Sequence, residues 1–225
     1  MEKNGDTRDE LIERKCSGQN PSSLTSTLIR FAYQISRGME FLHSRAILHR
    51  DLAARNVLLF DTNVVKISHF GMAQRGPMYT CHLQGPLPVR WMPPEAIENR
   101  LFTQPSDVWS FGVVLWEMFT MGATPYAATH CIQKQSVGDF LAGLKNGLRL
   151  DKPMTCPEFI YHLMQQCWQL SPEDRPNFAV LSEQFKIILD SETEDTYLRL
   201  NNSYAQFNDI HRDILKNAFE VHVNR

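Results

Sequence analysis

The chain has 225 residues, of which 43% are hydrophobic and 21% are charged, and this composition excludes a chain that is disordered throughout. Its 23 lysine and arginine residues against 25 aspartate and glutamate residues give a formal net charge of −2, which argues against nucleic-acid or anionic-membrane binding by bulk charge. The five cysteines are scattered without any C-x-x-C pair, which argues against a disulfide scaffold or a zinc site and favours a reducing compartment.

The N-terminal part begins with a polar segment and continues as a long helix. Residues 1–22 are charged and lack the apolar stretch of a secretory signal, so we interpret them as a lead-in or linker. From Ser23 on, apolar residues recur every three or four positions and predict an amphipathic helix with Ser22 or Ser23 as its N-cap. The residues of this apolar face are Leu24, Leu28, Phe31, Ile35, Met39 and Leu42.

A small β-hairpin is predicted next, from VLLF at 57–60 and VVKIS at 64–68 with turn-forming residues between them. Residues 69–92 contain few periodic apolar positions, so we expect an irregular functional loop. Apolar periodicity then predicts four helices, at residues 106–121, 137–146, 157–169 and 176–190. The first of these four is apolar nearly all round and is expected to be buried. A last amphipathic helix is predicted in the tail, around 207–221.

The most informative stretch is HRDLAARN at residues 49–56. It matches every fixed position of the H-R-D-L-x-x-x-N catalytic loop of protein kinases. A carboxylate at Asp51 can orient an incoming hydroxyl and accept its proton, and the amide of Asn56 can reach back to a metal on nucleotide phosphates. Arg50 is suited to a bidentate pair with a phosphate on the neighbouring loop.

A second motif departs from the kinase pattern. In kinases a strand leads into Asp-Phe-Gly, whose aspartate holds magnesium, but here the strand at 64–68 leads into His69-Phe70-Gly71. Magnesium prefers hard oxygen ligands, so an imidazole at His69 weakens the metal site whether it is neutral or protonated. We interpret His69 as a residue that has drifted in a non-catalytic copy, with a sequencing difference as the alternative.

Further motifs follow in the order that kinases carry them, namely LPVRWM at 87–92, Pro93-Pro94-Glu95 in place of Ala-Pro-Glu, SDVWSFG at 106–112, Cys167-Trp168 and Arg175-Pro176. With these, the chain resembles the C-terminal lobe of a protein tyrosine kinase over roughly residues 20–190. The resemblance implies a mainly α, protein-kinase-like fold, in which a helical lobe with a short β-hairpin carries the catalytic loop.

The resemblance also implies a role for each motif residue in the reaction. Asp51, Arg55 and Asn56 are implied to be catalytic. Asn56 and His69 stand where the family binds ATP and its Mg²⁺, with His69 in place of the usual aspartate. Arg55 after two alanines, and Pro88 in the segment before the third motif, are typical of tyrosine rather than serine/threonine kinases.

Other motif residues are implied to have regulatory or structural roles. The regulatory pair is Arg50 and Tyr79, because Tyr79 lies in the loop that is phosphorylated in family members; an ordinary exposed tyrosine is the alternative. The residues implied to be structural are His49, Glu95, Asp107 and Arg175. By resemblance, Glu95 forms a buried ion pair with Arg175, and Asp107 accepts hydrogen bonds from the backbone of the catalytic loop.

The tail contains two candidate docking tyrosines, Tyr197 and Tyr204, each followed three places on by an apolar residue. A phosphotyrosine in that setting is typical of sites that recruit Src-homology-type adaptors. The alternative is that the neighbouring apolar residues pack the tail onto the lobe. The segment 197–204 also resembles the ending of receptor kinases related to the platelet-derived and vascular endothelial growth factor receptors.

The expected organisation is therefore a polar, kinase-insert-like lead-in at 1–22, a tyrosine-kinase C-terminal lobe at 23–190 and a tail at 191–225. Neither a G-x-G-x-x-G run nor a V-A-I-K-like strand occurs in the sequence, so we expect the N-terminal lobe to be absent and catalysis to be lost or severely impaired. The face that would meet such a lobe is expected to expose Leu58, Phe60, Phe70 and Met72.

Two functions remain open at this stage. The first is an enzyme fragment, part of a receptor tyrosine kinase that uses ATP and Mg²⁺ to phosphorylate protein substrates. The second is a non-catalytic pseudokinase module that binds signalling partners through its helical surface or its phosphotyrosine tail. A cytoplasmic location is expected in both cases, with membrane attachment only through an upstream segment of a parent receptor, and neither charge nor ligand spacing supports a nucleic-acid or metal protein.

Overall fold

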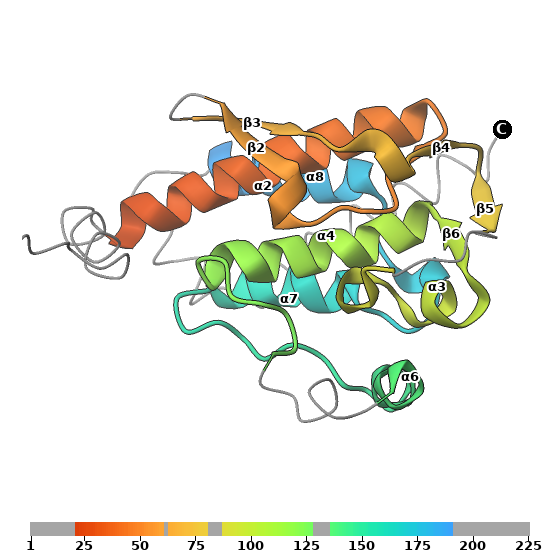
Figure 1. The fold of residues 1–225 in the computed structure, drawn as a ribbon. Coiled ribbons are helices and arrows are strands. Elements are labelled where there is room, and N and C mark those ends of the chain that lie inside the picture. The colour runs from red at the N-terminus through yellow and green to blue at the C-terminus, as the bar shows by residue number, and fades with distance from the viewer. Residues whose placement is uncertain (1–20, 61–62, 81–86, 128–135, 191–225) are drawn as a thin grey trace, which may run out of the picture.

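The computed structural model describes residues 21–60, 63–80, 87–127 and 136–190, and this part of the chain is mostly helical (Figure 1). Its helices are α2 (Pro21–Ser44), α3 (Pro94–Asn99), α4 (Gln104–Phe119), α6 (Val137–Lys145), α7 (Glu158–Cys167) and α8 (Phe178–Asp190). The predicted mainly α lobe with one short hairpin is confirmed, as are the helices predicted from apolar periodicity after residue 105. The lead-in before α2 and the tail helix predicted around 207–221 lie outside the described residues.

Three pairs of short antiparallel strands lie on this helical body. The predicted hairpin is confirmed, since β2 (Val57–Phe60) pairs with β3 (Val64–Ile67). The other pairs are β1 (Ile47–Leu48) with β4 (Gln74–Arg75), and β5 (Met78–Thr80) with β6 (Leu101–Thr103). The segment predicted as an irregular loop at 69–92 is therefore more ordered than expected, because β4 and β5 find their partners far away in the sequence.

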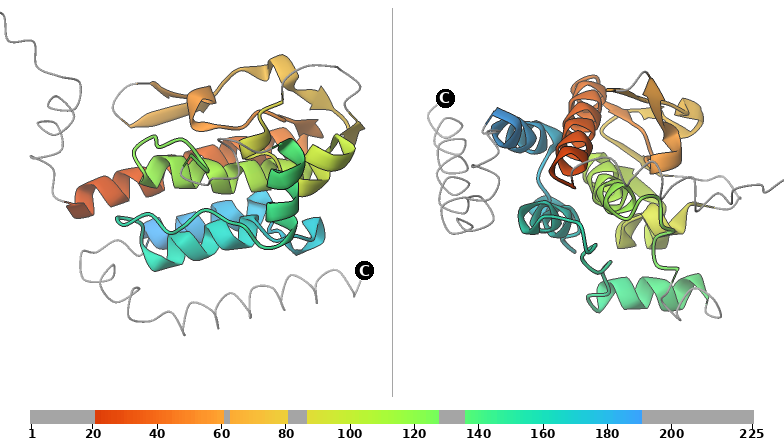
Figure 2. Two further views of the ribbon diagram at one scale, coloured as in Figure 1. Left: turned by 60° about the horizontal axis from the view of Figure 1, so that its bottom comes forward. Right: turned by 90° about the vertical axis from the view of Figure 1, so that its left-hand side faces the viewer.

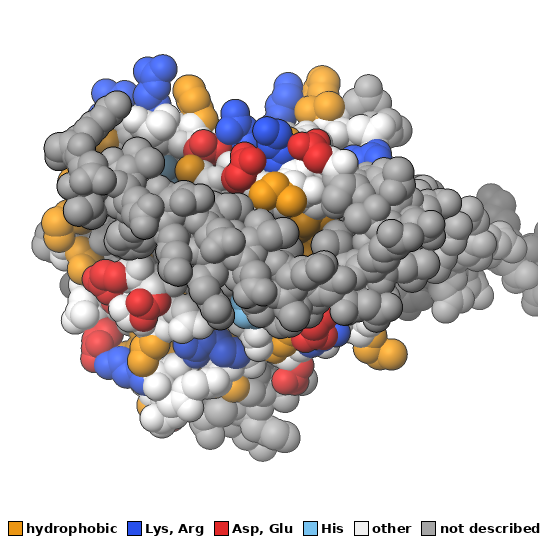
Figure 3. All heavy atoms as spheres, turned by 180° about the vertical axis from the view of Figure 1, so that it is seen from behind, with side chains coloured by type: hydrophobic (Ala, Val, Ile, Leu, Met, Phe, Trp, Pro, Cys, Tyr) orange, Lys and Arg blue, Asp and Glu red, His pale blue; other side chains and the backbone are white. Residues whose placement is uncertain are grey.

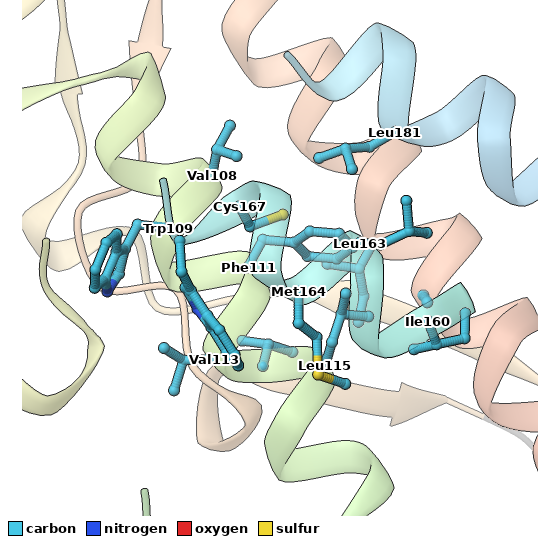
Figure 4. Close-up of a cluster of buried hydrophobic side chains, with 14 of the residues drawn as sticks. Val108, Trp109, Phe111, Val113, Leu115, Ile160, Leu163, Met164, Cys167 and Leu181 are labelled. Atoms are coloured by element: carbon cyan, nitrogen blue, oxygen red, sulfur yellow. The ribbon is translucent and has the colours of Figure 1, made fainter. Parts of the chain in front are cut away.

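The core is built around α4, which is buried along most of its length as predicted. Its apolar side chains, Trp109 and Phe111 among them, interdigitate with those of α7 and α8 (Figure 4). The two helices α4 and α7 lie side by side, and α2 packs along α8 (Figure 2). Gly112 permits the close approach of α4 to α7, because a Cβ at this position would lie 2.6 Å from Trp168 Nε1.

Helix α2 differs from its prediction in two details. It begins at Pro21, so Ser22 and Ser23 lie within its first turn and neither of them is the N-cap. Its buried stripe is also rotated, because Phe31 is only partly buried while the fully buried residues include Ile29, Ala32 and Ser36. Packing between elements explains this difference, because α8, α4 and β3 all pack against α2 and cover more than one side of it.

An apolar face is exposed on the hairpin side of the lobe. Leu58 is 55% exposed and Phe60 is 62% exposed, and Phe70 is also exposed, as predicted. Met72 is half-buried, which corrects its prediction as an exposed residue. On the opposite side of the molecule, Lys and Arg side chains are interspersed with Asp and Glu side chains (Figure 3). No helix in the described part of the chain combines the length and the apolar character needed to cross a bilayer.

Candidate active site

The backbone of the catalytic loop is held by Asp107, in the first turn of α4. Asp107 is 1% exposed, and its Oδ2 accepts the His49 N–H at 2.9 Å while its Oδ1 accepts the Arg50 N–H at 2.8 Å. Oδ2 also lies 2.9 Å from His43 Nε2. A carboxylate at a helix N-terminus is favoured by the helix dipole. The second of these donors is the N–H of Arg50, whose φ of 68° is in the left-handed region that non-glycine residues seldom adopt.

His49 connects this loop to the end of β3. Its fully buried ring accepts the Asp51 N–H at Nδ1, at 3.3 Å, and lies 3.0 Å from the Ser68 carbonyl oxygen at Nε2. One ring nitrogen must accept while the other donates, which corresponds to the neutral imidazole with its proton on Nε2. The structural role implied for His49 therefore has a physical basis, because the ring joins Asp51 to the residue just before His69.

Arg55 and Asn56 both donate hydrogen bonds to the carboxylate of Asp51. The chain turns back through a 3₁₀ segment, Ala54–Asn56, so that Arg55 Nη2 donates to Asp51 Oδ1. Asn56 Nδ2 donates to Asp51 Oδ2 at 2.8 Å and to the Asp51 carbonyl at 2.6 Å. Both carboxylate oxygens are thus oriented by hydrogen bonds to neighbouring side chains, the arrangement that a base for a substrate hydroxyl requires.

Arg50 and Tyr79, the two regulatory candidates, are in direct contact. The Arg50 guanidinium lies 4.0 Å from the centroid of the Tyr79 ring and 4.7 Å from that of Phe102, and its Nη1 donates to the Met72 carbonyl at 2.8 Å. Tyr79 and Phe102 are register partners in the β5–β6 pair, so the pairing of these strands builds the aromatic cage around the arginine.

His69 stands next to this cluster, where kinases carry the aspartate of Asp-Phe-Gly. It follows β3 with φ 64° and ψ 58°, and it precedes the 3₁₀ segment Phe70–Met72. Both the N–H and the Oγ of Ser68 donate to the Asn56 carbonyl at 2.9 Å, which places His69 beside Asn56. Its side chain is exposed.

The residues at this position do not fit a magnesium site. Magnesium demands oxygen ligands in near-octahedral geometry and is usually bound through one or two carboxylates. Here the position that supplies this carboxylate in kinases holds the His69 imidazole, which is not a hard oxygen ligand. Among the residues that the structure describes, no group of three or more His, Cys, Asp or Glu side chains could hold a metal.

The ion pair implied between Glu95 and Arg175 is present. Arg175 Nη1 donates to Glu95 Oε1 at 2.6 Å, and Nη2 donates to Oε2 at 3.0 Å. The Arg175 side chain is fully buried, and its remaining hydrogen bonds go to backbone carbonyls. The pair ties α3 to the segment before α8, as the implied structural role requires.

Sequence reasoning missed Glu117 and Trp91. Glu117 lies on α4 and is 8% exposed, and its Oε2 accepts the Trp91 Nε1–H at 2.9 Å and the Ala54 N–H at 2.8 Å. Burial raises the pKa of Glu117, and the two hydrogen bonds and the Arg55 charge partly offset this effect. A glutamate within the otherwise apolar stretch at 111–119 of this helix was the available signal.

The candidate docking residues Tyr197 and Tyr204 lie outside the described residues, and so do Cys16, Cys81 and Cys131. Of the remaining candidates, the structure brings together Asp51, Arg55, Asn56, His49 and Asp107. It places Arg50 with Tyr79 in the adjoining aromatic cage, and it places Glu95 with Arg175 in a separate pair.

The family model for protein tyrosine and serine/threonine kinases matches residues 2–185, which is most of the chain. This match covers the catalytic loop, the His-Phe-Gly segment, the helices α2, α3, α4, α6 and α7, and the first part of α8. The chain therefore belongs to the protein tyrosine and serine/threonine kinase family.

Proposed function

We propose that this chain is a tyrosine-kinase-type catalytic lobe whose phosphoryl transfer is severely impaired. Members of the family generally use ATP and Mg²⁺ and act on protein substrates. The observation that carries the proposal is His69, an imidazole in place of the metal-binding carboxylate, beside an otherwise well-formed Asp51 cluster.

The expected loss follows from what phosphoryl transfer requires. In kinases two magnesium ions are held by the Asp of Asp-Phe-Gly and by the Asn of the catalytic loop, and charge neutralisation with positioning accounts for most of the catalysis. Here only Asn56 has a suitable oxygen. Residues 1–225 also contain no glycine-rich run and no strand lysine of the kinase type. Asp51 can still orient a hydroxyl, but the phosphoryl group to be transferred is not fixed.

Tyrosine is the acceptor that the cluster supports best. Arg55 donates to Asp51 and lies over the Trp91 ring, 4.4 Å from its centroid, so the Ala-Ala-Arg signature of tyrosine kinases has a structural counterpart. A receptor of the platelet-derived or vascular endothelial growth factor type is the subfamily proposed from residues 197–204. The proposed domains are 1–22, 23–190 and 191–225, with a cytoplasmic location.

The proposal is tested by incubating the chain with Mg²⁺, labelled ATP and a poly-Glu-Tyr acceptor. We expect no label transfer above that of an Asp51→Asn control. His69→Asp alone is not expected to restore transfer to this chain, because the phosphate-fixing lysine is still missing. Transfer by the unaltered chain that disappears in Asp51→Asn contradicts the proposal.

A second candidate function is a non-catalytic interaction module. It is supported by the exposed apolar side chains of the hairpin, Leu58, Leu59 and Phe60, which are of the kind that partner surfaces cover. Signalling adaptors that bind phosphorylated Tyr197 or Tyr204 are the proposed partners. A doubly phosphorylated peptide covering residues 193–211 is expected to retain Src-homology-type domains, and equal retention by its unphosphorylated twin contradicts this role.

A further inference from the structure

A buried carboxylate lies directly beneath the catalytic loop. Glu117 is on α4, a helix whose other buried residues are mostly apolar, and its Oε2 accepts two hydrogen bonds. One comes from the Ala54 N–H, at the start of the 3₁₀ segment that ends at Asn56. The other comes from the indole N–H of Trp91. Glu117 therefore fixes both the start of the turn and the orientation of the Trp91 ring.

The Trp91 ring in turn supports Arg55. The Arg55 guanidinium lies 4.4 Å from the centroid of this ring, and the same guanidinium donates to Asp51 Oδ1. The Arg55 side chain is partly exposed, so without the ring it would have several rotamers in solvent. A continuous series of contacts thus leads from Glu117 through Trp91 and Arg55 to the Asp51 carboxylate.

Packing alone does not explain a charge at this position. The carbonyl oxygen of a glutamine could also accept hydrogen bonds here without the cost of burying an ionised group. Hydrogen bonds to a neutral oxygen are, however, weaker than those to a carboxylate, and a glutamine carries no charge that attracts Arg55. Burial raises the pKa of Glu117, while its two hydrogen bonds and the nearby charge of Arg55 act in the opposite direction. The charge of Glu117 therefore strengthens the hydrogen bond from the Trp91 indole and attracts the Arg55 guanidinium. The burial of this charge lowers the folding stability.

We propose that Glu117 is a positioning residue, which holds Arg55 against the Asp51 carboxylate through the ring of Trp91. This role rests on the proposed function only in taking Asp51 as the carboxylate that meets the substrate hydroxyl. The test below needs no phosphoryl transfer, so its failure leaves the proposed function standing.

The test is ¹H–¹⁵N NMR of the side-chain resonances of Trp91, Arg55 and Asn56 in the 225-residue chain. In Glu117→Gln we expect the Arg55 Nε–H to move toward the position of free arginine, because the guanidinium leaves the ring current of the indole. The Asn56 amide is expected to shift with it, because Asn56 Nδ2 donates to the same carboxylate. Glu98→Gln is the matched control, since Glu98 is an exposed glutamate paired with Lys145.

A second variant separates positioning from simple support of the core. Trp91→Phe keeps a ring beneath Arg55 but has no N–H for Glu117, and we expect the same loosening of Arg55. Because both changes act on the same series of contacts, Glu117→Gln combined with Trp91→Phe is expected to shift Arg55 no further than the larger single change. Unchanged Arg55 and Asn56 resonances in Glu117→Gln overturn the proposal, and so do additive shifts in the double variant.

Discussion

Replacing Asp107 by alanine removes the acceptor that holds the backbone of the catalytic loop. The His49 and Arg50 N–H groups, at 2.9 and 2.8 Å from its two oxygens, would be left buried and unpaired. A buried donor without a partner costs about 1–3 kcal/mol, so two such donors cost about 2–6 kcal/mol. That is a large share of the about 5–15 kcal/mol by which domains are usually stable.

Asp107→Asn refines this expectation. Its amide keeps one oxygen for either the His49 or the Arg50 N–H, but its NH₂ group faces the other donor. We therefore expect a loss of about half that of Asp107→Ala. Glu98→Gln, which breaks an exposed pair with Lys145, is the control and is expected to cost less than about 1 kcal/mol.

Urea unfolding followed by tryptophan fluorescence measures these differences. With a slope of about 2 kcal/mol per molar urea, Asp107→Ala is expected to lower the midpoint by about 1–3 M. Amide hydrogen exchange at His49 and Arg50 gives the local measurement, and both amides are expected to exchange faster in the variant. A midpoint equal to that of Glu98→Gln, with unchanged exchange at both amides, refutes the assignment of Asp107 as the anchor of the loop.

Glu95→Gln leaves the buried Arg175 charge without its counter-charge and is expected to lower the unfolding free energy by up to about 3–5 kcal/mol in the same urea assay; a loss below 1 kcal/mol, on the order of an exposed pair, contradicts this. Burial raises the pKa of Glu117 above its ordinary value of 4.5, so the folded state holds this proton to higher pH than the unfolded state, and wild-type stability falls relative to Glu117→Gln as pH rises from 4.5 through the folded-state pKa. Unfolding free energies of both chains across that range test this expectation, and a constant difference argues against it. Burial also raises the pKa of Cys156 and of Cys167 to about 12, so iodoacetamide at pH 8 is expected to modify neither thiol in the folded chain and both in urea, as read by peptide mass spectrometry. Modification of either one in the folded chain would contradict its burial.

Local patterns in the sequence predicted the elements that are determined by residues close together in the chain. The buried helix α4, the β2–β3 hairpin and the apolar face of α8 follow from residues three or four apart, or from a turn between two short runs. The motif HRDLAARN at 49–56 likewise identified the Asp51 cluster, because Asp51, Arg55 and Asn56 meet within a single turn of the chain. The replacement of the Asp-Phe-Gly aspartate by His69 could also be recognised from the sequence, since it depends only on which residue follows β3.

What only the tertiary structure decided were the partners that lie far apart in the chain. Strands of two or three residues have no periodicity to detect, so the β1–β4 and β5–β6 pairs were missed, and with them the stacking of Tyr79 and Phe102 on Arg50. Glu117 was missed for the same reason, because its 63-residue separation from Ala54 is closed only by the packing of α4 beneath the loop. A buried polar group must find its hydrogen-bond partner wherever the fold provides one, and local sequence does not record where that is.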